Sequence, residues 1–441
     1  MSCAPVHVTG SGLPCGSEYR KVEPFWSVLW SERNFAALAA GLAFCAIPLS
    51  IAATEFFLAV ALAFRIRMLT RWRMPVSIPL FIWFWFPWTT LEILLWLRSP
   101  DVRAGFGEIR HLLLPVAVYL VVPTLGRASD RVAVWRGLFV TATAGSCFVI
   151  CGFAYRLAHY WREVVLTADP SMYLRTGGLL HHWMIYGTIE VMAFAALLEF
   201  WRLYPEEHRY LVPMVIVNAL AILLSLTRML WICCLVLLVV HLMRHRSKWI
   251  WATPFLPLAL LVIGPVRTRL TDSLQPDYYS NAERLQMLRV GWKMVLRNPV
   301  TGVGPGRVEE LYRTYLSAAD PVPAYHGHLH NNAMQLAAQF GVPVLLAATL
   351  FLGAMLIELR KRSRAAKDRD AQFLYRVSFA GVAGFLMAGM FDYTYGHSLG
   401  LILVSFVALA PLQLKQEDRR GMSCSGSLTA GSSEACVAGD T

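Results

Sequence analysis

The chain has 441 residues, 56% of them hydrophobic and 15% charged, and its formal net charge is +12 at pH 7. Soluble domains carry about 25% charged residues, so this composition excludes an ordinary soluble protein. The basic charge does not indicate nucleic-acid binding, since no basic soluble domain stands apart from the apolar runs. A helix needs about 20 apolar residues to cross a bilayer. The runs are continuous rather than alternating, so we predict a polytopic all-α membrane protein and not a barrel.

Twelve apolar segments are expected to form transmembrane helices, nine within residues 33–265 and three within 332–413. In chain order they lie at about 33–50, 52–68, 76–97, 111–126, 132–156, 179–201, 209–226, 229–243, 249–265, 332–358, 372–391 and 395–413. Residues 1–32 are expected to be a cytoplasmic tail without a cleaved signal peptide, because no apolar run and small-residue cleavage site follow a charged start. Residues 414–441 are rich in Ser, Gly and charge, and we expect a disordered cytoplasmic tail.

The basic residues divide the connections between these spans into two sets. Short basic connections alternate along the chain, at 65–73, 127–136, 202–209, 244–248, 360–369 and 415–420. Short loops of this kind are retained in the cytoplasm, so both termini are predicted to be cytoplasmic. The opposite face then receives the large polar loop 266–331. Its basic residues are not explained by retention, because long loops escape that rule, and an anionic ligand is the simplest reason for them.

The large loop has helical periodicity of its own. Apolar residues recur at helical spacing over about 281–296, where Asn281 can cap the start and Asn298-Pro299 ends the run. A second short helix is expected at about 307–317, after a glycine-rich turn. We therefore predict a helical cap over one face of the membrane.

The end of the loop carries a recognisable pattern. His330 and Asn331 are followed by a nine-residue gap and then Gly341, and this resembles the signature of the O-antigen ligases, although Val344 stands where the family has a small residue or Tyr. Further stretches that resemble the family, in chain order, are Arg175-Thr176-Gly177-Gly178, Leu224-Ser225-Leu226-Thr227-Arg228, Glu283-Arg284 and Asn298-Pro299-Val300-Thr301-Gly302-Val303-Gly304. The resemblance covers roughly residues 170–345.

The resemblance implies a glycosyltransferase whose fold is similar to the GT-C type of membrane enzyme. Its donor would be a polysaccharide on undecaprenyl pyrophosphate and its acceptor a sugar hydroxyl of lipid A–core, at the periplasmic face of a bacterial inner membrane. An O-antigen polymerase and a protein O-oligosaccharyltransferase belong to the same superfamily and remain alternatives. From other classes, a polysaccharide or lipid transporter and a non-catalytic membrane scaffold also remain open.

Such a transfer requires cations for the leaving pyrophosphate. The large loop has no Asp-x-Asp and no close pair of carboxylates for a divalent metal, so we predict a metal-independent enzyme without a cofactor. An arginine can replace the metal, because its planar guanidinium binds phosphate oxygens bidentately and stays charged. The candidates are Arg175, Arg228, Arg284 and Arg289. For each of them the ordinary alternative is an arginine whose charged end extends to the membrane interface.

The acceptor hydroxyl requires a base. A neutral histidine suits proton abstraction near pH 7, and His330 is the candidate base, with His328 on the same face of an extended chain as its assistant. Asn331, which is expected to cap the helix that follows, and Gly341 are supporting residues. Alternatively, His330 only hydrogen-bonds the start of the next helix, or the histidines bind zinc. Against zinc, the sequence shows no nearby Cys or carboxylate that would complete the set of ligands. Possible supporting groups near the same face are Asp392, His397, His181 and His182.

Overall fold

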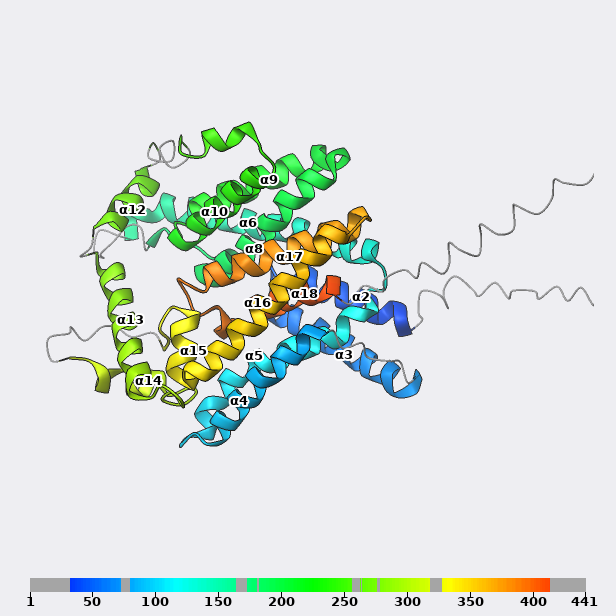
Figure 1. Cartoon of the computed structure of the whole chain (residues 1–441). Coiled ribbons are helices and arrows are strands. Elements are labelled where there is room, and N and C mark those ends of the chain that lie inside the picture. The colour runs from blue at the N-terminus through cyan, green and yellow to red at the C-terminus, as the bar shows by residue number, and fades with distance from the viewer. Residues whose placement is uncertain are drawn as a thin grey trace, which may run out of the picture.

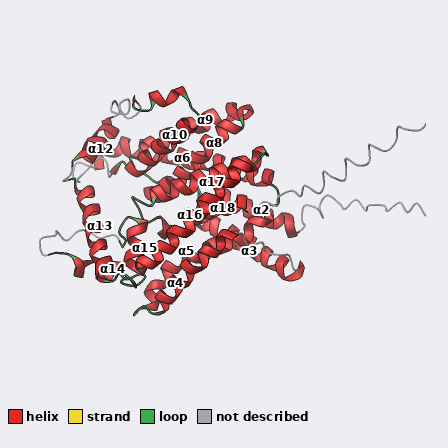
Figure 2. Ribbon diagram, in the orientation of Figure 1, coloured by secondary structure: helices red, strands yellow, loops and turns green. Residues whose placement is uncertain are grey.

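The computed structural model describes residues 32–72, 80–163, 173–180, 182–255, 262, 264–275, 278–317 and 327–412. The expected tails 1–32 and 414–441 lie outside these residues, except for Glu32 at the start of the first described helix. All regular structure within the described ranges is helical (Figure 2). The prediction of an all-α protein is confirmed to this extent.

Figure 1 shows the helices coloured in chain order. The first half contains α2 (Glu32–Ala46), α3 (Ile51–Trp72), α4 (Trp85–Leu97), α5 (Val102–Val121), α6 (Ala128–Glu163) and α8 (Trp183–Leu203). The second half contains α9 (His208–Leu224), α10 (Arg228–Arg244), α12 (Gly264–Leu274), α13 (Tyr279–Arg297), α14 (Val308–Leu311), α15 (Asn332–Phe340), α16 (Val342–Ala365), α17 (Arg369–Ala388) and α18 (Ser398–Leu412). Short 3-10 turns, among them η5 (Lys248–Ala252), η6 (Tyr312–Tyr315) and η7 (Thr394–Gly396), join several of them.

Six described helical segments are long and apolar enough to cross a membrane. They are Val102–Thr124, Ala128–Tyr160, Trp183–Leu203, Pro205–Leu224, Val342–Ala365 and Arg369–Ala388. Shorter apolar helices, such as Asn34–Ala46 and Ser398–Ala408, accompany them. These helices point to a helical membrane protein, whereas the count of twelve spans and the likeness to the GT-C type stay predictions.

The centre of the bundle is α8, of whose span 78% is buried, against 22% for α9 and for α16. It packs against α17, α10 and α9. Aromatic side chains fill the space between these helices, as Phe200 of α8 contacts Phe139 of α6 and Phe373 of α17 with ring centroids 5.3 Å apart in both cases. The three helices α8, α10 and α17 extend from one end of the bundle to the other and pack against one another.

The single helix expected over 332–358 is two helices, α15 and α16, which meet at Gly341. The glycine has φ +85°, a left-handed conformation that side chains other than glycine's adopt only under strain. It ends α15, and its N–H donates to the carbonyl of Ala337. The turn after α13 packs against this break, where Val303 N–H donates to the Ala338 carbonyl over 2.8 Å. Continuous apolar character concealed this break. The span expected at 249–265 begins with the 3-10 turn η5 and then largely leaves the described residues.

The cap predicted from the large loop is helical as expected. α13 runs across one end of the bundle rather than along it (Figure 1), and its buried side chains Met287, Val290 and Met294 pack with Leu329. It ends at Arg297, with Asn298 as its C-cap, and α14 and η6 supply the second short helix. The expected cap at the start is wrong: α13 begins at Tyr279, and the Asn281 side chain serves another contact, described below.

Candidate functional site

A cavity of about 450 Å³ opens where the cap meets the ends of α8 and α10. Its polar lining includes four arginines and one histidine, which come from five separate segments: Arg175, Arg228, Arg269, Arg284 and His330. Its apolar lining includes Ile232 of α10, Leu285 and Leu288 of α13, and Phe391. A cavity lined by both cationic and apolar side chains suits a ligand that combines a charged group with a hydrocarbon chain.

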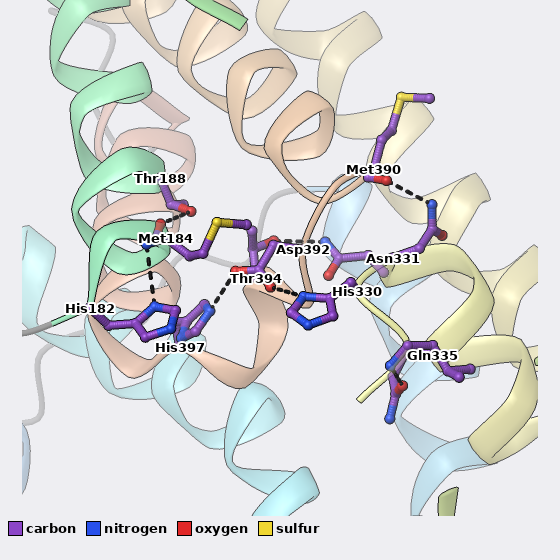
Figure 3. A network of polar contacts seen from close by, with 12 residues as sticks. His182, Met184, Thr188, His330, Asn331, Gln335, Met390, Asp392, Thr394 and His397 are labelled. Carbon is purple, nitrogen blue, oxygen red and sulfur yellow. Dashed lines mark hydrogen bonds and ion pairs between the residues drawn. The ribbon is translucent and has the colours of Figure 1, made fainter. Parts of the chain in front are cut away.

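His330 is held in a turn immediately before α15. Its φ is +48°, which is uncommon for a residue other than glycine and is often found at functional sites. Two bonds hold this turn: Asn331 caps α15 by accepting from Met334 N–H over 2.9 Å, as predicted, and Leu329 N–H donates to the Gln335 side chain over 2.8 Å. The imidazole therefore has a defined direction (Figure 3).

Asp392 lies 62 positions further along the chain and joins two histidines. Its Oδ1 is 2.9 Å from His330 Nδ1, and its Oδ2 is 2.9 Å from His397 Nε2 (Figure 3). Burial of this carboxylate, which is 1% exposed, disfavours its charge, but the hydrogen bonds with His330 and His397 outweigh that effect and hold the Asp392 pKa well below its usual range. An ionised carboxylate only accepts hydrogen bonds, so it selects the His330 tautomer that carries its proton on Nδ1. Nε2 is then the nitrogen with a lone pair.

His328 lies beside His330, with the two ring centroids 4.2 Å apart. Burial, together with the neighbouring His330, lowers the pKa of His328 to about 4, so this imidazole is neutral at pH 7. Its Nδ1 is buried without a hydrogen-bond partner, and the residue is not part of the cavity lining. The structure therefore distinguishes the two histidines that the sequence paired: only His330 lines the cavity.

The structure places a carboxylate, that of Asp392, where it could complete a zinc site with the two histidines. Ligand atoms of His328, His330 and Asp392 all lie within 4.8 Å of one another, and two imidazoles with one carboxylate are a donor set that catalytic zinc uses. The sequence argument that no carboxylate completes the set is wrong for this reason. A metal bound there would compete with existing hydrogen bonds, because both oxygens of that carboxylate are already bonded to histidines.

Arg228 and Arg284 form the cationic centre of the cavity. Arg228 donates to Asn281 Oδ1 over 2.7 Å and to Ser280 Oγ over 3.1 Å, which are neutral acceptors on α13. Burial, and then the neighbouring charge of Arg228, lowers the pKa of Arg284. Within the described part of the chain neither guanidinium forms an ion pair with a carboxylate. Two adjacent positive charges without carboxylate partners create a strong preference for an anion.

The other arginines divide into those that reach the cavity and one that does not. Arg175 is buried, and its guanidinium lies 5.4 Å from the ring centroid of Trp183. Arg269 of α12, which is 1% exposed and bonded to the Tyr278 hydroxyl, also lines the cavity. Nothing in the sequence distinguishes Arg269 from the other arginines of the large loop, because its burial is visible only in the folded structure. Arg289 was selected, but it is exposed and outside the cavity lining.

Gly341 has a structural role in this arrangement. A side chain at this position would collide with the backbone of Pro299 and Val300. Val342 N–H also donates to the Pro299 carbonyl over 2.8 Å. The glycine thus allows the turn after α13 to dock on the start of α16, which holds α13 and its arginine over the cavity.

Comparison with known proteins identifies one family. Residues 213–349 match the family model described as O-antigen ligase, which confirms the resemblance drawn from the motifs. The matched segment contains Arg228, Arg284 and His330, whereas Arg175 and Asp392 lie outside it. No curated protein matches the chain significantly.

Proposed function

Since the chain carries a domain of the O-antigen ligase family, we propose that it is an O-antigen ligase of the bacterial inner membrane. The donor is a polysaccharide on undecaprenyl pyrophosphate, and the acceptor is a sugar hydroxyl of lipid A–core at the periplasmic face. One observation carries the proposal: His330, oriented by Asp392, lines the same cavity as Arg228 and Arg284. A base and a set of cations in one cavity are the two requirements of this transfer.

In the proposed reaction His330 Nε2 takes the proton of the acceptor hydroxyl. The hydroxyl oxygen then attacks the anomeric carbon of the donor, while the bond between that carbon and the pyrophosphate oxygen breaks. Attack from the side opposite the leaving group inverts the configuration and needs no covalent intermediate. The Nδ1–H of His330 remains on Asp392 Oδ1, whose negative charge stabilises the imidazolium that forms.

The arginines act on the leaving group. Negative charge grows on the pyrophosphate as the bond to the sugar breaks, and fixed cations that face this charge stabilise the transition state more than the ground state. Arg228 and Arg284 would supply this charge, and Arg175 and Arg269 line the same cavity. The apolar residues Ile232, Leu285 and Leu288 provide contact for the first isoprene units of the donor.

A deletion strain tests the proposed acceptor. Loss of all O-chains from lipopolysaccharide, with polysaccharide accumulating on the undecaprenyl carrier, is expected for a ligase. Lipopolysaccharide that carries single repeats would instead identify a polymerase and contradict the proposal.

The zinc alternative is tested with purified protein, lipid-linked donor and rough lipopolysaccharide. Transfer is expected to continue in excess chelator, and inactivation that zinc or magnesium reverses would contradict a metal-independent reaction.

A further inference from the structure

The second concentration of charged side chains lies at the end of the bundle opposite the cavity. We call it the distal arginine cluster and define it by residues on three helices that also border the cavity end: Glu199 and Arg202 on α8, His241, Arg244 and His245 at the end of α10, and Arg376 on α17. α8 starts at Trp183 beside the cavity, and Glu199 lies one turn from its other end. The cluster is therefore separate from the candidate site.

Glu199 is the centre of the cluster and is 2% exposed. Arg244, His241 and Arg376 approach its two carboxylate oxygens at 3.6, 3.7 and 3.8 Å. None of these contacts is short enough for a hydrogen bond. Glu199 Oε2, His241 Nδ1 and Arg376 NH1 are indeed buried without any hydrogen-bond partner. Buried polar atoms are normally bonded, and each unsatisfied one indicates a missing partner.

The charge of the cluster is unbalanced. The cluster contains three guanidiniums and one carboxylate, so its excess is two positive charges before either histidine is protonated. Arg244 and Arg376 lie beside Glu199, and Arg202 contacts His245 over 2.9 Å. Burial, followed by the charge of Arg202, lowers the pKa of His245 to about 4, and this imidazole adds no charge at pH 7. An anion would balance the excess, and phosphate oxygens accept several guanidinium N–H groups at once.

Neighbouring arginines show that this imbalance is specific to the cluster. At the same end of the bundle Arg136 pairs with Glu207 over 2.7 Å, and Arg369 pairs with Glu206 over 2.6 Å. Each of these pairs is neutral and within hydrogen-bond distance. The usual retention of basic loops on one side of a membrane explains arginines at this end, but it does not explain why two of them share one buried carboxylate.

We propose that the distal arginine cluster binds the phosphate of an anionic phospholipid in the leaflet at that end of the bundle. Exposed apolar side chains on α10, Val240 at 46% and Met243 at 60%, lie next to Arg244 and offer a surface for the acyl chains. Basic pockets between transmembrane helices bind such headgroups in other membrane proteins. Bound lipid would join α8, α10 and α17, the helices that also form the cavity end.

A divalent cation is the competing occupant. Ligand atoms of Glu199, His241 and His245 lie within 4.8 Å of one another and could hold a metal ion. Two guanidiniums already lie beside that carboxylate, however, and their charge opposes a cation. The two occupants respond in opposite ways to Glu199→Gln, which removes a metal ligand but makes the cluster more positive.

The test uses the full chain in a neutral detergent with three additives: a phosphatidylglycerol, a phosphatidylcholine and inorganic phosphate. Thermal unfolding and native mass spectrometry report stabilisation and bound lipid. We expect phosphatidylglycerol alone to raise the Tm, by about 2–5 °C at saturation. The double variant Arg244→Gln with Arg376→Gln should lose most of this increase. The matched control, Arg136→Gln with Arg369→Gln, removes the same charge from two neutral pairs and should keep it.

Glu199→Gln provides a second measurement that does not depend on the double variant folding well. Phosphatidylglycerol should bind this variant at least as tightly as the wild type. Equal Tm increases in the cluster variant and in the control would overturn the proposal. Stabilisation by inorganic phosphate that matches the lipid effect would overturn its lipid part. Stabilisation by zinc that Glu199→Gln abolishes, without a lipid effect, would replace it with a metal site.

Discussion

Two histidine–carboxylate pairs of the described chain, His111–Glu92 and His330–Asp392, have different surroundings. His111 of α5 and Glu92 of α4 are 2.8 Å apart, with side-chain exposures of 2% and 0%. Trp88 donates to the second oxygen of Glu92 over 2.5 Å, and the ring of Tyr395 covers His111. His330 and Asp392 are 2.9 Å apart, but the His330 side chain is 17% exposed and lines a cavity with arginines.

The comparison shows that bond length does not identify a catalytic histidine. Both pairs have a normal hydrogen bond and a buried carboxylate. Only His330 combines that bond with access for a substrate and with cations that could hold a leaving group. The pair of His111 and Glu92 instead connects α4 with α5 and lies against the η7 turn, so its role is expected to be structural.

The largest expected effect comes from removing the two histidines separately. His330→Ala should reduce the initial rate of transfer by about 10²–10⁴-fold, as loss of a general base does. His111→Ala should leave transfer per folded molecule nearly unchanged. It should lower stability by about 3 kcal/mol, because Glu92 is left buried without its partner. Rates with purified protein and thermal unfolding measure the two effects.

Two further variants sharpen this contrast. Asp392→Asn keeps the size of the side chain but removes the charge, so its rate should fall between those of the wild type and His330→Ala. His328→Ala should have a smaller effect than His330→Ala. Normal transfer by His330→Ala with an inactive His328→Ala would reverse the assignment of the base, and normal transfer by both would remove the general-base mechanism.

A smaller effect is expected for the arginines of the cavity. Arg228→Ala and Arg284→Ala should each reduce the rate by about 10²–10³-fold, the range known for the loss of one group that stabilises transition-state charge. Lysine should restore part of the rate, because it keeps the charge and loses the planar fork. Arg289→Ala is the control, since this arginine lies on the same helix as Arg284 but outside the cavity lining. An equal loss in Arg289→Ala would point to the charge of the cap as a whole.

The smallest effect concerns pH and His328. Its pKa is lowered to about 4 in the folded protein, while an unfolded histidine titrates near pH 6.5. Between these values the unfolded state binds more protons, so stability falls as the pH drops from about 6.5 to about 4. His328→Gln should reduce this dependence by up to about 3 kcal/mol over the whole interval. Parallel curves of Tm against pH for the wild type and the variant would show that His328 is not the group responsible.

The sequence by itself determined the features that depend on local patterns. Continuous apolar runs predicted helices, Asn331 predicted the cap of α15, and Asn298-Pro299 predicted the end of α13. The pattern of His330, Asn331 and Gly341 predicted a resemblance to the family whose model matches residues 213–349. An arginine between two apolar runs, Arg228, was expected to face a ligand because burial of its charge is costly, and it does line the cavity.

Only the tertiary structure decided which distant residues meet. Asp392 reaches His330 because α17 ends beside the turn before α15, where Asn332 N–H donates to the Gly389 carbonyl over 2.7 Å. Arg269 enters the cavity and Arg289 does not, although both are arginines of the same polar loop, because α12 and α13 pack with particular faces towards the bundle. The break at Gly341 depends in the same way on the docked turn of α13. Contacts between residues far apart in the chain leave no periodicity in the sequence, so packing alone decides them.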